Sequence, residues 1–358
     1  MIVGIPLLDK LLAYLLQPFS SGTEVLTRLT STVRAFGYDL NSKTALPYML
    51  TSLAIAWLIH RRRKAAGDSS TPSSFRQFVF PREVYLHPSA VIDYKFVAID
   101  MTIKGFLYAP AISAASWGLY KALAALLGLS TQSSAQPLTV VSATVTLIAG
   151  VMLADLGYYV SHYLMHKVPL LWHFHKTHHS AEVLTPVTVY RIHPVEDLVN
   201  AFVGSVLNAL GAAVYSALSA QEVRFGTILG VNGILFFYYV FAFQLRHSHV
   251  WLSYGPAVSR VLISPAQHQV HHSKDERHWD RNFGFTFAIW DWLCGTLYVP
   301  LTREKIEFGI PGANREDFAT VGRMYFRPFR RAMESLRWGK PVALPAPLQS
   351  AGETLTRE

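Results

Sequence analysis

Residues 155–182 read DLGYYVSHYLMHKVPLLWHFHKTHHSAE, and this stretch decides both the fold and the chemistry. It contains the patterns HxxxH, from His162 to His166, and HxHxxHH, from His173 to His179. Residues three and four apart lie on the same face of a helix, so each pattern turns two or three imidazoles toward one point. Neutral imidazole is the commonest protein ligand for transition metals. The stretch therefore predicts a helical metal-binding segment.

Two further histidine clusters lie downstream, at residues 247–249 (HxH) and 268–272 (HxxHH). The four clusters hold eleven of the fifteen histidines and lie beside apolar and aromatic residues, unlike a polar surface tract that merely adheres to metal. They supply the roughly eight to ten ligands that two metal ions take, at four or five per ion, and so predict a site for two metals. Single histidines such as His60 and His87 are interpreted as interfacial or hydrogen-bonded residues.

Composition indicates the class of protein. Of the 358 residues, 51% are hydrophobic and 15% are charged, whereas a soluble globular chain carries about a quarter charged residues. The single cysteine, Cys294, excludes a disulfide framework. The formal net charge of +9 is interpreted as attraction to anionic lipid, because the chain is apolar and its basic residues are clustered. We therefore expect a membrane protein with no nucleic-acid partner.

Apolar stretches along the chain have all or part of the length of about 20 residues that a membrane-spanning helix needs. They are residues 44–60, 105–129, 138–158, 198–218 and 224–245. The first is followed by the basic run Arg61–Lys64, which is typical of the end of a span. We expect an all-α integral membrane protein: a bundle of about four to five transmembrane helices with a cytosolic helical cap that carries the histidine-rich dimetal site.

The distribution of Lys and Arg predicts which side of the membrane carries the histidines. Basic residues gather in 61–98, 160–197 and 246–358, while the expected hairpin tips, at Ser130–Pro137 and around Gln221, contain almost none. Because Lys and Arg accumulate in cytoplasmic connections, we expect the metal site on the cytoplasmic side.

The expected regions of the chain are an N-terminal amphipathic or membrane-associated segment (1–43), the first spans with a basic linker (44–149), a histidine-box domain (150–300) and a basic cytosolic tail (301–358). Two points stay open at this stage. Residues 1–43, with the apolar run Ile5–Leu16, either cross the membrane or lie along it. Residues Glu316–Trp338 form a helix that either lies on the membrane surface or packs on the core.

Four segments of the chain together carry a resemblance to a known family. They are residues 155–182, RIHPVED (191–197), PAQHQVHHSKD (265–275) and RNFGFTFAIWDWLCGTLYVP (281–300). They resemble the fatty acid hydroxylase/sterol desaturase superfamily of integral membrane di-iron enzymes, over about residues 150–300, and residues 75–95 look like a segment common in its bacterial members. The resemblance implies O2-dependent hydroxylation or desaturation of a lipid by a multi-pass protein of the bacterial inner membrane.

The resemblance implies ten metal ligands, all of them histidines. They are His162, His166, His175, His178, His179, His193, His247, His268, His271 and His272. His173 and His249 stand where relatives usually have other residues, and each is an extra ligand, a partner of a ligand or neither. The role of His278 is open in the same way.

A carboxylate commonly fixes a ligand histidine by accepting the N–H of its other ring nitrogen. Asp155 is the candidate for this role, because it lies seven residues before His162 and eleven before His166 and so shares their helical face. An ionisable residue inside a span is also costly and usually has a partner. The other acidic candidates, for which a solvated or capping role is favoured, are Glu196, Asp197, Asp280 and Asp291.

The cofactors that the resemblance implies are two iron ions and O2, with zinc able to replace the iron in expressed protein. The chain contains no haem or flavin motif, so we expect electrons to come from a separate electron-transfer protein. The alternative is a redox-inactive zinc-binding membrane protein. A transporter would place its ligands near the bilayer midplane, and a lipid hydrolase would need HExxH or GxSxG, which the sequence lacks. A third interpretation is a silent scaffold, and the identity of the lipid stays open.

Overall fold

The computed structural model describes residues 13, 14, 16–40, 45–128, 140–219, 227, 228, 231–241 and 243–338. Within these ranges the regular secondary structure is helical apart from one short antiparallel pair of strands, β1 (Thr227–Ile228) and β2 (Val231–Asn232). The prediction of a helical fold is confirmed. The predicted hairpin tips, most of the run Ile5–Leu16 and the tail beyond residue 338 lie outside the described residues.

The helices occur in the following order along the chain. The α-helices are α2 (Gly22–Gly37), α3 (Leu46–Ala65), α4 (Phe75–Val79), α5 (Arg82–Tyr85), α6 (Pro88–Ile103), α7 (Ala109–Leu126), α8 (Val140–Lys167), α9 (Pro169–His179), α10 (Pro194–Ser219), α11 (Gly233–Val240), α12 (Gly255–Val258), α13 (Pro265–His271), α14 (Ile289–Leu293) and α15 (Val321–Trp338). The short 3-10 helices are η1 (Gln17–Phe19), η3 (Pro186–Tyr190), η4 (Phe243–His247), η5 (Glu276–His278) and η6 (Arg315–Phe318), and η2 (Lys104–Tyr108) is a π-helical turn between α6 and α7.

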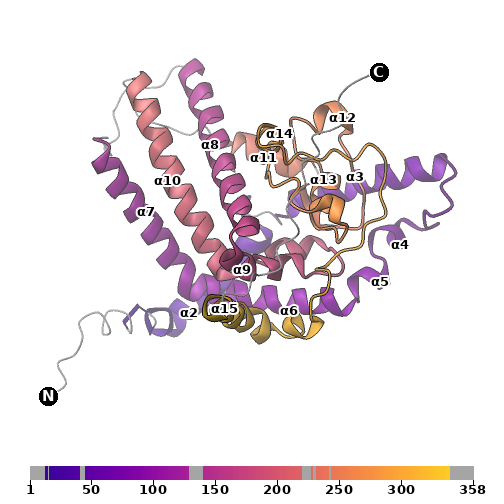
Figure 1. The fold of residues 1–358 in the computed structure, drawn as a ribbon, viewed down its shortest axis with the longest axis horizontal. Coiled ribbons are helices and arrows are strands. Elements are labelled where there is room, and N and C mark those ends of the chain that lie inside the picture. The colour runs from indigo at the N-terminus through magenta and orange to yellow at the C-terminus, as the bar shows by residue number, and fades with distance from the viewer. Residues whose placement is uncertain are drawn as a thin grey trace.

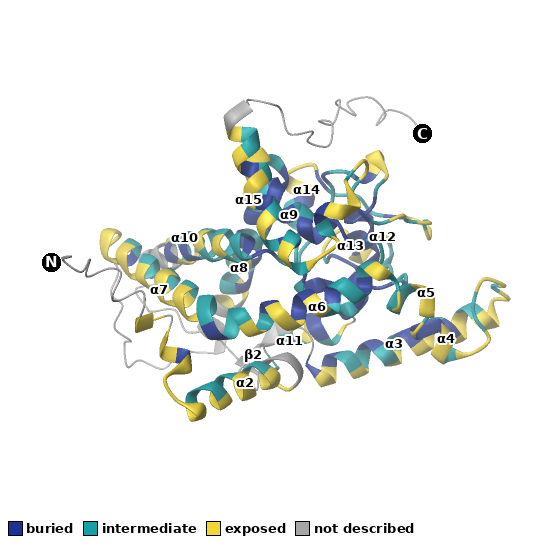
Figure 2. Cartoon of the chain, turned by 90° about the horizontal axis from the view of Figure 1, so that it is seen from below, coloured by how far each residue is buried: buried dark blue, intermediate teal, exposed yellow. Residues whose placement is uncertain are grey.

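Three long helices, α7, α8 and α10, stand side by side, and α10 packs against both of the others (Figure 1). Small residues allow this packing. A Cβ added to Gly157 of α8 would lie 3.6 Å from the Cα of Gly204 in α10, and one added to Gly211 would lie 2.1 Å from a methyl carbon of Leu153. Figure 2 shows exposed residues along α7 and buried residues gathered around α9 and α13. The outer surface of the long helices includes exposed apolar side chains such as Trp117 and Phe202.

One helix in the described ranges is long and apolar enough to cross a membrane, namely Pro88–Leu126, which comprises α6, η2 and α7. The predicted spans 44–60, 138–158 and 198–218 fall on α3, α8 and α10. The predicted span 224–245 is wrong as a single helix, because its described residues form β1, β2, the eight-residue α11 and part of η4. The sequence of this stretch contains glycines at 226, 230 and 233, and glycine lowers helix stability by about 1 kcal/mol per residue. The number of spans stays a prediction.

The C-terminal helix α15 covers residues for which the sequence left two locations open, the membrane surface and the protein core. It packs on α9 and α6, and its Met324 is fully buried. The opposite face stays exposed, with Phe326 at 74% and Leu336 at 71%. The helix therefore packs on the core with one face and presents an apolar surface with the other.

A buried ion pair fixes the end of α9, the helix that carries three of the candidate ligands. Arg191 and Asp93 are buried and paired with each other. The Arg191 guanidinium also donates to the carbonyl of Thr177, at 2.8 Å, and to the hydroxyl of Ser180, at 2.6 Å. The pair thus connects α6 to the C-terminal turn of α9.

Replacing Asp93 with asparagine is expected to lower the free energy of unfolding by about 3–5 kcal/mol, because it leaves a buried guanidinium without its counter-charge. Chemical unfolding of the purified protein in detergent measures this change. The matched control is Arg330→Gln, which breaks the exposed pair between Arg330 and Glu334 and should cost at most about 1 kcal/mol. Equal effects of the two substitutions would contradict the clamping role of Asp93.

Candidate dimetal centre

Four elements converge to bring most of the histidines together. The last turns of α8 supply an i, i+4 pair, α9 supplies three rings from its C-terminal half, η4 supplies its final residue, and α13 and its cap supply an HxxHH set. Nine of the ten predicted ligands lie in this cluster. They are His162, His166, His175, His178, His179, His247, His268, His271 and His272.

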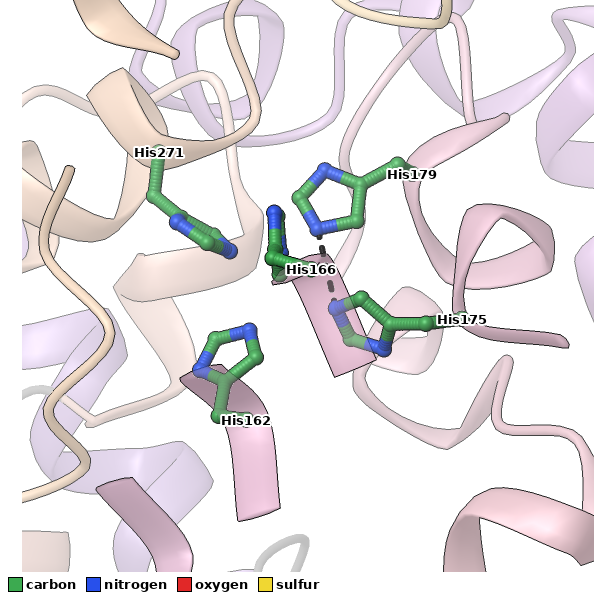
Figure 3. A group of neighbouring side chains, drawn as sticks. All are labelled: His162, His166, His175, His179 and His271. Carbon is green, nitrogen blue, oxygen red and sulfur yellow. Dashed lines mark hydrogen bonds between the residues drawn. The ribbon is translucent and has the colours of Figure 1, made fainter. Parts of the chain in front are cut away.

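The nine histidines divide into two groups, in each of which one ligand atom per residue lies within 4.8 Å of the others. Group one consists of His162, His166, His175, His179 and His271, whose rings point toward one another in Figure 3. Group two consists of His178, His247, His268 and His272. The groups are neighbours, because the rings of His179 and His272 stack with their centroids 4.5 Å apart.

Backbone carbonyls set the proton position of two rings in group one. The Nδ1 of His162 lies 2.8 Å from the carbonyl oxygen of Phe283, and the Nδ1 of His271 lies 2.7 Å from that of Arg281. A carbonyl oxygen only accepts, so each Nδ1 carries the proton and each Nε2 keeps its lone pair. Both Nε2 atoms are buried and have no hydrogen-bond partner. They are therefore free to bind a metal.

Carboxylates lie beside two more rings of group one, and one of them is within hydrogen-bond distance. The Nδ1 of His175 lies 3.0 Å from a carboxylate oxygen of Glu196, and the Nδ1 of His166 lies 3.6 Å from one of Asp280. The Nε2 of His166 is buried without a partner, and that of His175 faces the Nε2 of His179 at 3.1 Å. A carboxylate that accepts from Nδ1–H makes the imidazole a better metal ligand.

Group two brings its Nε2 atoms together through a chain of short contacts. His268 Nε2 lies 3.0 Å from His247 Nε2 and 3.2 Å from His272 Nε2, and His247 Nε2 lies 3.3 Å from His178 Nε2. All four side chains are buried. The convergence of these nitrogens at hydrogen-bond distance is the arrangement that a shared cation would draw together.

Burial favours the neutral, ligating form of three rings in the two groups. It lowers the pKa of His271 to about 3, and burial followed by repulsion from neighbouring imidazoles lowers the pKa of His162 and His272 well below the usual value. Neutral imidazole suits iron and zinc alike. The donor set therefore fits two transition-metal ions, held by five and four histidines.

The remaining predicted ligand, His193, lies outside both groups. It precedes Pro194 at the start of α10, where its Nδ1 accepts from the N–H of Val195 at 3.1 Å. Its Nε2 then carries the proton and donates to the carbonyl of Tyr325 at 3.0 Å. Both nitrogens are thus occupied in joining α10 to α15.

The three histidines whose roles were open also lie outside the two groups. Lys176 donates to the Nδ1 of His173 at 3.1 Å, and the Nε2 of His249 lies 2.7 Å from the carbonyl of Phe78. The Nε2 of His278 lies 3.1 Å from a carboxylate oxygen of Glu304. Each has a protein contact of its own.

The carboxylate of Asp155 accepts hydrogen bonds from a loop and not from a histidine ring. It accepts from the backbone N–H groups of Thr286 and Phe287, at 2.7 and 3.1 Å, and from the indole of Trp290 at 3.0 Å. Asp291 holds the same loop by accepting from the N–H groups of residues 283 and 284. The two acids therefore position the segment whose carbonyl at residue 283 faces His162.

Three charged residues beside the histidine groups were not predicted from the sequence to contact them. Glu196 and Asp280 were expected to be solvated or capping residues, yet both are buried beside group one. Arg246 was not considered, although it immediately precedes His247 and its guanidinium contacts His268. An arginine next to a histidine box in an apolar context was the available signal.

Replacing Glu196 with glutamine is expected to weaken metal binding at group one about 10- to 100-fold, because it removes the charge that fixes His175. Metal competition against a chelator measures the change. The control is Asp197→Asn at the next position, whose carboxylate pairs with Lys104 and should leave metal affinity unchanged. Equal affinities of wild type and Glu196→Gln would contradict this role.

Replacing His193 with alanine is expected to leave the metal content unchanged and to lower the free energy of unfolding by about 1 kcal/mol, the typical effect of losing a helix cap. Elemental analysis and denaturant unfolding give the two numbers. Loss of one metal per chain in this variant would show that His193 is a metal ligand.

Residues 147–296 match the family model described as fatty acid hydroxylase. An ornithine lipid hydroxylase from Rhizobium tropici is 29% identical over 172 residues, which are 48% of this chain and 47% of the relative. The alkylglycerol monooxygenase of Homo sapiens is 26% identical over 157 residues, 44% of this chain and 31% of the relative. A very-long-chain aldehyde decarbonylase from Oryza sativa subsp. japonica is 26% identical over 234 residues, 63% of this chain and 82% of the relative.

The chain thus spans less than half the length of the first two relatives. No solved structure gives a significant match to it.

Proposed function

We propose that this member of the fatty acid hydroxylase superfamily is a membrane di-iron oxygenase that uses O2 to hydroxylate a lipid, with desaturation as the related outcome. One observation carries the proposal: two neighbouring, buried, all-histidine groups whose Nε2 atoms converge. The matching relatives named as a lipid hydroxylase and as a monooxygenase support insertion of oxygen as the reaction.

The nine histidines of the two groups would hold the two ions. The chemistry that bound iron supplies is activation of O2 for attack on an unactivated C–H bond, which acid–base side chains do not perform. Imidazole ligands are neutral, so they would not offset the positive charge of the iron, which would stay redox-active. Zinc would fit the same nitrogens without supplying redox chemistry.

The residues around group one orient the ligands. The carbonyls of Arg281 and Phe283 and the carboxylate of Glu196 accept from Nδ1–H, so that Nε2 would face a bound metal. Burial of the rings excludes water from the reacting volume, which protects a reactive oxidant from side reactions.

A membrane location is proposed for the whole chain. The helix Pro88–Leu126 is long and apolar enough to cross, and the neighbouring long helices expose apolar side chains. We propose a multi-pass protein of the bacterial inner membrane with the metal site on its cytoplasmic side. There a separate electron-transfer protein would deliver the electrons that O2 activation consumes.

Lipid analysis with isotopic oxygen tests the proposal. Cells that express the chain under iron supply, with an electron donor, are grown under ¹⁸O2, and their lipids are compared by mass spectrometry with those of cells expressing His162→Ala/His247→Ala, which lacks a ligand in each group. A lipid that gains one ¹⁸O atom, or loses two hydrogens, only with the wild type supports the proposal. An unchanged lipid profile from protein that contains two irons overturns it, and zinc-only protein without product favours the redox-inactive alternative.

A further inference from the structure

Arg246 places a buried positive charge against group two. Its side chain is 2% exposed, and its guanidinium donates to the hydroxyl of Tyr238 at 2.9 Å and to the carbonyl of Phe285 at 2.7 Å. It also donates to the Nδ1 of His268 at 2.8 Å. A guanidinium has five N–H donors and no acceptor, so Nδ1 of His268 is the acceptor of this bond.

This bond reverses the arrangement seen around group one. With Nδ1 accepting, the neutral ring of His268 carries its hydrogen on Nε2, the atom that faces His247 and His272. In group one, by contrast, Nδ1 of His162 and of His271 donates to a carbonyl and leaves Nε2 bare. A metal that takes Nε2 of His268 therefore competes with the bond from Arg246, whereas metal binding at group one strengthens its outer bonds.

The charged side chains beside the two groups also favour a cation in group one over a cation in group two. The carboxylate of Glu196 lies 3.0 Å from Nδ1 of His175 in group one and attracts a cation, while Asp280, beside His166, is paired with Lys167. The guanidinium of Arg246 lies against group two and repels a cation. Because these groups are buried, solvent and salt screen the interactions little.

We infer that the two metal positions have unequal affinity, and that Arg246, as a positioning residue acting through His268, makes group two the weaker by at least about tenfold. The inference rests on the dimetal site of the proposed function. The purified protein then holds one firmly bound ion in group one and one exchangeable ion in group two.

Cobalt titration of one-site variants tests the inference. The purified full-length chain is stripped of metal and titrated with Co²⁺ against a competing chelator. His247→Ala disables group two and should retain tight binding through group one. His162→Ala/His271→Ala leaves three histidines in group one, as His247→Ala does in group two, and should bind at least about tenfold more weakly through group two. Equal affinities, or tighter binding by His162→Ala/His271→Ala, would overturn the inference.

A second pair of variants isolates the charge of Arg246. In the His162→Ala/His271→Ala background, Arg246→Gln should raise the Co²⁺ affinity of group two about tenfold, whereas Arg246→Lys, which keeps the charge, should not. Structural damage would lower the affinity, so a rise reports the removed charge. Arg260→Gln, at an exposed arginine, should have no effect. If Arg246→Gln does not fold, the comparison of His247→Ala with His162→Ala/His271→Ala still decides whether group two is the weaker site.

The outcomes separate this inference from the proposed function. Unequal affinities without any lipid product leave the inference standing and remove the proposed reaction. A lipid product from protein with two equal sites removes only the inference. Failure of the wild type to bind Co²⁺ overturns both.

Discussion

Replacing His271 with alanine should abolish lipid oxidation and remove about one of the two metals. The ring of His271 is central to group one, with centroids 4.6 Å from His162, 4.7 Å from His179 and 4.9 Å from His166. Its Nε2 is buried without a protein partner. Alanine leaves no donor at that point, and we expect turnover to fall at least about 10³-fold, or about 4 kcal/mol of barrier. Product quantification and elemental analysis measure the two effects.

The control is a second buried histidine outside the metal groups. His60 is 5% exposed, and its Nε2 lies 2.9 Å from the carbonyl of Pro72. His60→Ala also removes a buried imidazole, but should keep two metals and full turnover per folded molecule. An active His271→Ala protein with two metals would refute the ligand assignment.

Removing the metals should lower the thermal unfolding midpoint. Without a cation, the buried Nε2 atoms of His162, His166 and His271 have no partner, and buried unsatisfied polar atoms are costly. An ion that binds only the folded chain stabilises it by about 4 kcal/mol when its free concentration is a thousand times its dissociation constant. Thermal unfolding in detergent, with and without chelator, measures the loss.

Two comparisons make this second prediction specific. Adding back Fe²⁺ or Zn²⁺ should restore the midpoint, since both fit imidazole ligands, while only iron should restore turnover. The variant His162→Ala/His247→Ala should respond much less to chelator than the wild type. An identical midpoint for metal-free and metal-loaded wild type would show that the histidine groups fold without assistance from metal.

Helical periodicity explains why most of the site was predictable. The spacing of three and four within HxxxH and HxxHH places the rings on one face of α8, α9 and α13, and these faces meet. The same periodicity does not show how one helix begins. At the start of α10 the first amides lack partners within the helix, and His193 caps one of them. Local geometry thus gave His193 a structural contact that its position beside the histidine boxes did not reveal.

Contacts between distant segments explain what the sequence could not show. Asp155 does lie near the histidines along α8, but the loop at residues 286–290 returns to it and uses both carboxylate oxygens. Glu196 reaches His175 because α10 packs against α9, a contact that spacing along one helix does not encode. Likewise, apolar length predicted the helices α3, α7, α8 and α10, while the glycine-containing stretch 224–245 does not form the expected single helix.

Each metal group draws on two distant parts of the chain, and this has a consequence for biosynthesis. Group one has four ligands between residues 162 and 179 and its fifth at residue 271, while group two has one at residue 178 and three between 247 and 272. A nascent chain that has emerged only as far as α10 therefore carries an incomplete set for either ion. Under the proposed function, group one is complete only once residue 271 has left the ribosome, and group two only once residue 272 has. Maturation would then place the helices between the two parts before both ions are enclosed.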